Sequence, residues 1–439
     1  MAPANTPKKP FHVAVCGGGI GGLCMTIGLL HQNISCKVYE AAPAFAEIGA
    51  GVSFGPNAVA AMSLIDPDIR KGYDHRVTRN AWPEKQPHWF DYRIGMKESG
   101  WKDFPGGPPA QEGVEVAQVK AGNLGQSSVH RAHFLDELVK LVPADVAEFG
   151  KRVEKVEKVG EKMRLTFQDG TTAEADAVIG CDGVKARTRQ ILLGENHPAT
   201  HPVFSGVYAY RGLIPMEKAV EAVGDELARN SQMYLGHNGH LLTFPIEKGA
   251  TMNVVAFHRK EDGKWENDQW VLPMKKEDMF RDFEAWGDSV KHILSLMEKP
   301  DVWALFDHAP APTYYQGRFA LLGDAAHAST PHQGAGAGQA IEDAYVLSNL
   351  LGKVESVQDI EKAFHAYDAV RRPRSQKVVK TSRDAAAIYE FVDDELAGDL
   401  KKIKERLETR LNWIWDEDLG QQLKDAERIM MDSGVRASL

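Results

Sequence analysis

The chain has 439 residues, of which 43% are hydrophobic and 26% charged, and its formal net charge is -9. These values are typical of a globular protein with a large core, and the length suits two domains. Lysine and arginine are spread along the chain, which argues against nucleic-acid binding, and no apolar run reaches the roughly 18 residues of a membrane span.

The N-terminus and the cysteines indicate the compartment. Residues 1–10 contain no apolar core of a secretory signal, so we expect a flexible tail. The cysteines are Cys16, Cys24, Cys36 and Cys181, and none forms a C-x-x-C pair. This usage favours a reducing, cytoplasmic location without disulfides and without a metal site.

The chain opens with an alternation of strand and helix. Residues 12–16 form a short apolar run typical of a buried strand, and a glycine cluster follows. Residues 21–32 have helical spacing, and residues 36–40 form a second strand. Such a βαβ opening favours a parallel sheet.

The middle of the chain changes character. Residues 76–128 lack clear periodicity, 133–141 are helical, and 163–167 with 171–179 predict a β-hairpin around Asp169-Gly170. Several strand-like runs between 203 and 258 then favour an antiparallel sheet.

The last third is predicted to be largely helical. Residues 275–297 carry apolar side chains at helical spacing, which predicts one core-facing helix. Residues 318–323 resemble one more buried strand before a second glycine cluster, and the chain from about 336 onward is mostly helical.

The first chemical motif is G-x-G-x-x-G at Gly17, Gly19 and Gly22. Glycines at these places permit a tight turn, close approach of a pyrophosphate and close helix–strand packing. Glu40 ends the second strand, where a carboxylate can accept hydrogen bonds from a ribose. The combination predicts a dinucleotide site rather than a structural glycine turn, but it does not separate FAD from NAD.

The second motif spans Gly323 to Ala344. Asp324 follows a strand and can bind a ribityl hydroxyl, while Gly334, Gly336 and Gly338 allow a ligand to approach the backbone. The helix that begins there can direct its N-terminal amides to the edge of a flavin ring.

The third motif, Asp182-Gly183 within 179–189, follows a predicted buried strand. Alone it is a common turn, and it gains weight from its position between the other two motifs.

The three motifs in this order resemble those of single-component FAD-dependent aromatic hydroxylases, the group typified by para-hydroxybenzoate hydroxylase. The run 331–344 and the segments 49–52 and 56–58 are especially similar to the salicylate hydroxylase branch. The resemblance extends over roughly residues 11–375.

The resemblance implies an α/β fold with a discontinuous Rossmann-like FAD-binding domain, an inserted substrate domain with a mixed or antiparallel sheet, and a C-terminal helical segment. The expected ranges are 11–75, 110–195 and 315–375 for the first, 76–109 and 196–314 for the second, and 376–439 for the third.

It also implies hydroxylation of a phenolic substrate with NADH or NADPH and O2, through a flavin C4a-hydroperoxide on non-covalent FAD. Arg131 matches the family arginine that contacts FAD, and Arg189 matches the arginine that closes the third motif, whereas Ala186 replaces its usual serine. The expected cofactor-binding residues are Gly17, Gly19, Gly22, Glu40, Ala50, Gly51, Arg131, Asp182, Gly183, Asp324, Gly334, Gly336 and Ala337.

Three residues are expected to act on the substrate. His332 is the first choice for a base, because an imidazole titrates near neutral pH and lies beside the flavin-contacting glycines. Arg211 is expected to hold a phenolate or carboxylate, and Tyr234 to donate a hydrogen bond. Each could instead be structural, and His327 is a second choice for the histidine.

Other functions stay open at this point. A salicylate-like substrate is favoured, and a polyketide-derived phenol is the main alternative. A flavin oxidoreductase that does not insert oxygen, or a nucleotide-binding sensor without catalysis, would carry the same glycine motifs. The sequence is compatible with a monomer or a homodimer.

Overall fold

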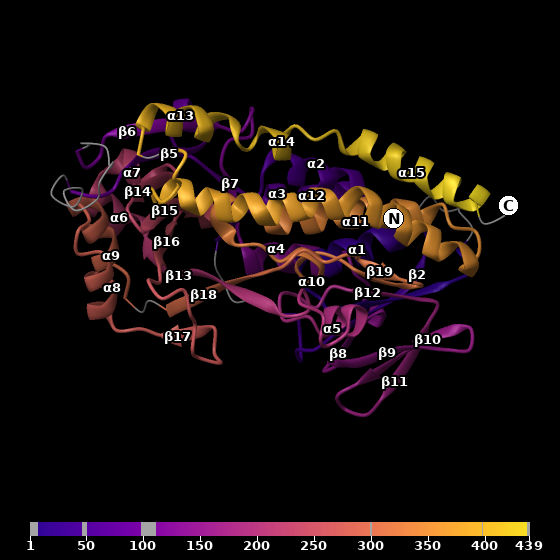
Figure 1. Cartoon of the computed structure of the whole chain (residues 1–439). Helices are drawn as coiled ribbons and strands as arrows, with labels where there is room; N and C mark the ends of the chain where they lie inside the picture. Colours follow the sequence, from indigo (N-terminus) through magenta and orange to yellow (C-terminus); the bar gives the residue numbers. More distant parts are fainter. Residues whose placement is uncertain (1–7, 46–50, 98–110, 299–300, 397, 437–439) are drawn as a thin grey trace.

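The computed structural model describes residues 8–45, 51–97, 111–298, 301–396 and 398–436. Two sheets with separate hydrophobic cores lie at opposite ends of the molecule, and the long helix α12 (Ile360–Tyr389) runs along both (Figure 1). The cavities described below lie between these two parts.

The first part is built on a mostly parallel sheet with strand order β19-β20-β12-β1-β2-β8. β1 pairs in parallel with β2 and with β12. The pairing with β2 is parallel because the buried helix α1 (Ile20–His31) carries the chain back after β1. The strands are β1 (His12–Cys16), β2 (Ser35–Glu40), β8 (Ala147–Phe149), β12 (Ala177–Gly180), β19 (Tyr315–Gln316) and β20 (Phe319–Leu321).

The second part is built on a mixed sheet with strand order β17-β18-β13-β16-β15-β14-β5-β6. Its neighbours are antiparallel except for β14 and β5, which run parallel. The strands are β5 (His88–Ile94), β6 (Glu115–Lys120), β13 (Pro202–Pro215), β14 (Gln232–Gly236), β15 (Gly239–Ile246), β16 (Thr251–Arg259), β17 (Val271–Pro273) and β18 (Asp301–His308).

Two small sheets complete the strands. One is the meander β9 (Val153–Val159), β10 (Lys162–Phe167) and β11 (Thr172–Ala175), which projects at the lower right of Figure 1. The other joins β3 (Gly51–Ser53), β7 (Ser127–His130) and β4 (Thr78–Arg79).

The remaining helices cover the sheets, and α13, α14 and α15 follow the length of α12 along the top of Figure 1. No helix among the described residues is both long and apolar enough to cross a membrane. These helices are α2 (Pro56–Ile65), α3 (Pro67–Arg76), α4 (Arg131–Val139), α5 (Arg187–Leu193), α6 (Met216–Val223), α7 (Asp225–Arg229), α8 (Lys276–Asp282), α9 (Asp288–Ser295), α10 (Asp324–His327), α11 (Gly336–Gly352), α13 (Leu400–Thr409), α14 (Asn412–Trp415) and α15 (Leu419–Arg436).

Two predicted elements differ from the structure. The hairpin partner expected over 171–179 divides at Asp176: β11 pairs with β10, but β12 joins the parallel sheet. The single helix expected over 275–297 breaks between α8 and α9, because Gly287 is extended and starts α9. The predicted core-facing surface is confirmed, because the buried side chains of both short helices belong to the core of the mixed sheet.

The predicted domain division also differs at two places. β6, which was expected in the FAD-binding part, pairs with β5 in the mixed sheet. The boundary expected at 375/376 falls inside α12, whose early residues, such as Phe364, belong to one core and whose late residues, such as Ile388, belong to the other. α12 continues across this boundary because its apolar side packs first on the core of the parallel sheet and then on that of the mixed sheet.

Candidate active site

A cavity of about 720 Å³ lies where the parallel strands end. Residues of the first and third motifs, of the end of β2 and of the start of α4 line it. Its lining includes Gly17, Gly19, Glu40, Arg131, Asp182 and Gly183. Ligands of open α/β sheets bind in this position, outside the carboxyl ends of the strands.

The glycines of the first motif are required by backbone contacts. A Cβ on Gly17, whose φ is +111°, would lie 2.4 Å from the carbonyl oxygen of Cys181. A Cβ on Gly22 would lie 2.0 Å from the carbonyl oxygen of Gly17, so the start of α1 packs tightly on the turn. The Glu40 carboxylate accepts hydrogen bonds of 2.7 Å from the amides of Gly18 and Ala42, which holds it at the cavity.

A second cavity, of about 280 Å³, continues from the first and shares Gly19 and Arg131 with it. Asp324, Gly334, Gly336 and Ala337 line it, so the second motif meets the other two here. The glycine backbone after β1 and the carboxylates of Glu40, Asp182 and Asp324 at or after the ends of other parallel strands fit an extended nucleotide such as FAD. Gly51 lines the first cavity, and Ala50 lies outside the described residues.

The third motif also anchors the start of the second glycine-rich loop. Asp182 accepts hydrogen bonds from the amide and the hydroxyl of Thr188, which fixes the start of α5. Arg189 is fully buried and donates to backbone carbonyls of both neighbouring segments, at Ala199, Ala309, Ala325 and Ala326. Its role in this structure is to join loops.

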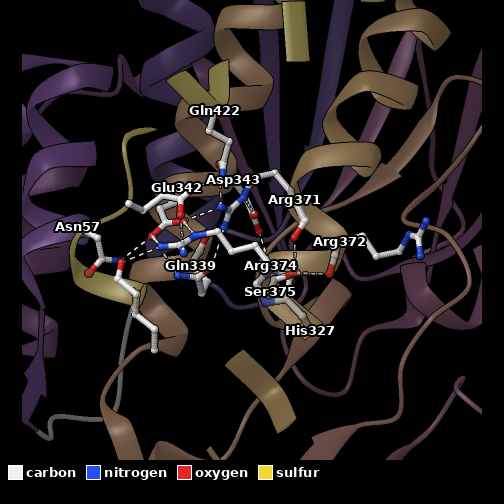
Figure 2. Close-up of polar contacts among 12 residues, drawn as sticks. Asn57, His327, Gln339, Glu342, Asp343, Arg371, Arg372, Arg374, Ser375 and Gln422 are labelled. Carbon is white, nitrogen blue, oxygen red and sulfur yellow. Dashed lines mark hydrogen bonds and ion pairs between the residues drawn. The ribbon is translucent and has the colours of Figure 1, made fainter. Parts of the chain in front are cut away.

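A buried ion network supports the Gly323 loop from behind. Figure 2 shows the side chains of Glu342, Asp343, Arg371 and Arg374 pointing toward one another. Asp343 accepts hydrogen bonds from the Gly323 amide at 3.1 Å and from Arg371 Nε at 2.7 Å. These contacts fix the loop that carries Asp324.

The same network reaches the C-terminal helices. Arg374 binds Glu342 and also donates to the carbonyl oxygens of Trp413 and Ile414. Burial raises the pKa of Asp343, but His327 and Arg371 outweigh it and hold the value at about 2. Sequence reasoning did not find this network, although the pair Glu342-Asp343 stands inside the second motif.

A third, smaller pocket of about 160 Å³ lies between the mixed sheet and the loop 331–334. Alternate residues of several strands face it, as the two-residue period of a strand requires. Its lining includes Trp89, Phe90, Ala209, Met233, Leu242, Phe244, Val255, Phe257, Trp303 and Leu305. This mainly apolar surface has few polar groups, and they are therefore informative.

Arg211 is one of the polar groups at this pocket, and it also lines the first cavity. Its guanidinium lies 4.8 Å from the centre of the Trp303 ring, and among the described residues it has no carboxylate partner. Burial, together with the nearby Arg131, lowers the pKa of Arg211 to about 10. An anionic ligand in the pocket would compensate this charge.

His332 is the second polar group, and it is almost entirely buried in η5 (Pro331–Gln333). Its Nδ1 lies 3.3 Å from Nε2 of His240, and its ring packs against Phe257. Burial, followed by the charges of His240 and Arg259, holds the pKa of His332 well below its ordinary value. The imidazole is therefore neutral near pH 7 and can accept a proton.

Tyr234 does not reach the pocket. It lies between Met233, which lines the pocket, and Leu235, and its side chain is buried on the opposite face of β14. His327 likewise does not line the small pocket, and its Nε2 lies 2.5 Å from Asp343 in the ion network. The structure thus brings His332 and Arg211 together and separates both from Tyr234.

The βαβ unit, the joined cavities and the adjoining apolar pocket define a flavoprotein that acts on a small ligand next to the nucleotide. Residues 11–382 match the model of the FAD binding domain family, and the chain belongs to this family. It is an FAD-dependent monooxygenase.

Similar proteins cover nearly the whole chain. A 6-methylsalicylate 1-monooxygenase of Aspergillus terreus is 46% identical over 96% of this chain and 92% of its own. A salicylate hydroxylase of Pseudomonas putida is 39% identical over 97% of this chain and 96% of its own. The solved structure of a salicylate hydroxylase substrate complex, 40% identical, superposes with a TM-score of 0.84 over 95% of this chain and 98% of that one.

Proposed function

We propose that this enzyme hydroxylates a single-ring phenol that carries a neighbouring carboxylate, as salicylate and 6-methylsalicylate do. The observation that carries the proposal is the small pocket with a cation and a neutral imidazole in its wall. Its volume of about 160 Å³ is close to that of the roughly 150 Å³ cavity that accepts benzene. This space matches one aromatic ring more closely than it matches a fused polyketide.

Each polar group has a task in this proposal. Arg211 binds the substrate carboxylate through charge-assisted hydrogen bonds, which sets the orientation of the ring. His332 accepts the phenolic proton and makes the ring more electron-rich. The apolar walls exclude water from the reacting ring.

The residues of the larger cavities would hold FAD without a covalent bond, and bound FAD would supply the oxygen activation. NADH or NADPH would supply two electrons, one oxygen atom would enter the ring, and the other would leave as water. The chain is proposed to work in the cytoplasm as a monomer or homodimer.

The test follows oxygen uptake and NAD(P)H oxidation by the FAD-loaded protein, together with product analysis. Salicylate or 6-methylsalicylate should stimulate both and yield a hydroxylated product, whereas benzoate lacks the hydroxyl and should yield none. His332→Asn should reduce the hydroxylation rate about 10²–10⁴-fold with FAD still bound. An FAD-loaded enzyme that hydroxylates only larger fused phenols would contradict the proposal.

A further inference from the structure

Behind His332 lies a row of hydrogen-bonding groups that ends near the surface. His240 Nδ1 lies 3.1 Å from Oε1 of Glu390, and Glu390 Oε2 accepts from Nε of Arg259 at 2.9 Å. Together with the contact between His332 and His240 these four residues form the histidine array. They come from η5, β15, the end of α12 and the end of β16.

The array is held rigidly. His240 and Glu390 are fully buried, while Arg259 is 31% exposed. The His240 ring stacks on Phe257 at 4.3 Å with an interplanar angle of 12°, and Tyr389 packs edge-on at 5.2 Å. The imidazole of His240 therefore has no freedom to turn away from its two partners.

Hydrogen-bond chemistry then decides which nitrogen carries each proton. A carboxylate paired with Arg259 can only accept, so Nδ1 of His240 donates to it. Nε2 of neutral His240 is then an acceptor, and it accepts a hydrogen bond from Nδ1–H of His332. The remaining nitrogen of His332, Nε2, is left unprotonated for the pocket.

We propose that His240 and Glu390 are positioning residues that set the tautomer of His332 and keep its Nε2 as the acceptor of the phenolic proton. The inference rests on the proposed function. When the phenolic O–H bond breaks, a proton binds to Nε2 of His332, its Nδ1 proton can pass to Nε2 of His240, and the Glu390 carboxylate stabilises the resulting positive charge.

The surroundings explain why Glu390 is needed. Burial lowers the pKa of His240, and Glu390 only partly opposes this effect. Arg259 and Arg410 lie near enough to lower the pKa of His332 further. Other titratable neighbours among the described residues include Tyr389, which accepts from Arg410 at 3.2 Å, and Tyr92, whose ring centre lies 5.6 Å from that of Tyr389. His237 is a further one, and the charge of Glu390 partly opposes the lowering of its pKa by burial.

Two substitutions should move the pH profile of hydroxylation in opposite directions. Glu390→Gln removes the negative charge that stabilises the protonated histidines, which lowers the pKa of the base, so the acid limb of kcat should move down by about one pH unit, equivalent to a tenfold change in the protonation equilibrium. Arg259→Gln removes a positive charge that opposes protonation, which raises the pKa of the base, so the limb should move up. KM should stay within about twofold in both, since neither residue lines the small pocket.

His258→Asn is the matched control, because His258 is a half-buried histidine on the same strand as Arg259 but contacts Tyr208 instead of the array. Its pH profile should equal that of the wild type. If Glu390→Gln or Arg259→Gln retains the wild-type profile, or if both move it in the same direction, the positioning role is overturned. Wild-type protein without salicylate-dependent hydroxylation would instead overturn the proposed function itself.

Discussion

Two buried polar groupings each include residues of the second motif, and they are built differently. The ion network balances two carboxylates, Glu342 and Asp343, against two guanidinium groups, Arg371 and Arg374, all of them buried. The histidine array holds two neutral imidazoles and one carboxylate, and its only guanidinium is partly exposed.

The difference distinguishes a grouping that stabilises the fold from one that can act on a ligand. In the network every charge is compensated inside the protein. Its effect is to hold the backbone in place at Gly323 and at the C-terminal helices. In the array one end is a histidine in the wall of the small pocket. Four predictions, two of which concern pH dependence, should break or sharpen this contrast.

The largest effect is expected from Arg371→Met. The substitution leaves two buried carboxylates with one cation fewer, which should lower the free energy of unfolding by about 3–5 kcal/mol. Lys380→Met is the control on the same helix: Lys380 pairs with Asp384 at the protein surface, where the two side chains are 75% and 47% exposed, and its loss should cost under about 1 kcal/mol. Urea unfolding measures both, and equal losses would refute the distinction.

Arg211 provides the next test, because its charge is compensated by neither grouping. Arg211→Met should weaken salicylate binding to the FAD-loaded enzyme about 10–100-fold, equivalent to ~1.4–2.7 kcal/mol. Phenol, which lacks the carboxylate, should bind equally well to both proteins. Titration of the flavin absorbance with each ligand measures this, and an equal loss for phenol would show that Arg211 shapes the pocket instead of binding an anion.

The smallest effect concerns pH. The pKa of His332 is depressed in the folded state, so the unfolded chain binds the proton first and stability falls as pH drops below about 6.5. His332→Asn should remove up to ~1.4 kcal/mol per pH unit of this slope between pH 7 and 5. Urea unfolding at both values tests it, and equal slopes in wild type and variant would contradict the assignment.

The ion network should respond in a lower range. The pKa of Asp343 is depressed to about 2, so its contribution to stability is complete above about pH 4 and is lost as pH falls toward 2. The two groupings should therefore lose stability in separate pH windows.

The sequence alone determined the nucleotide site. Gly17, Gly22 and Glu40 belong to a local βαβ unit of about 25 residues, although the contact that excludes a side chain at Gly17 comes from Cys181, far along the chain. His332 was also predicted this way as a substrate-side residue, because it stands beside the glycines of the second motif, and it lines the small pocket.

Only the tertiary structure decided which side chains meet the small pocket. β14 and β15 are buried on both faces, so alternation of polar and apolar residues cannot show which face lies toward the ligand, and Tyr234 was placed on the wrong one. The partnership of His240 with Glu390 crosses 150 residues and depends on where α12 ends against the mixed sheet. The spacing of residues along the sequence cannot predict such a contact, because it arises from packing between elements that are distant in the chain.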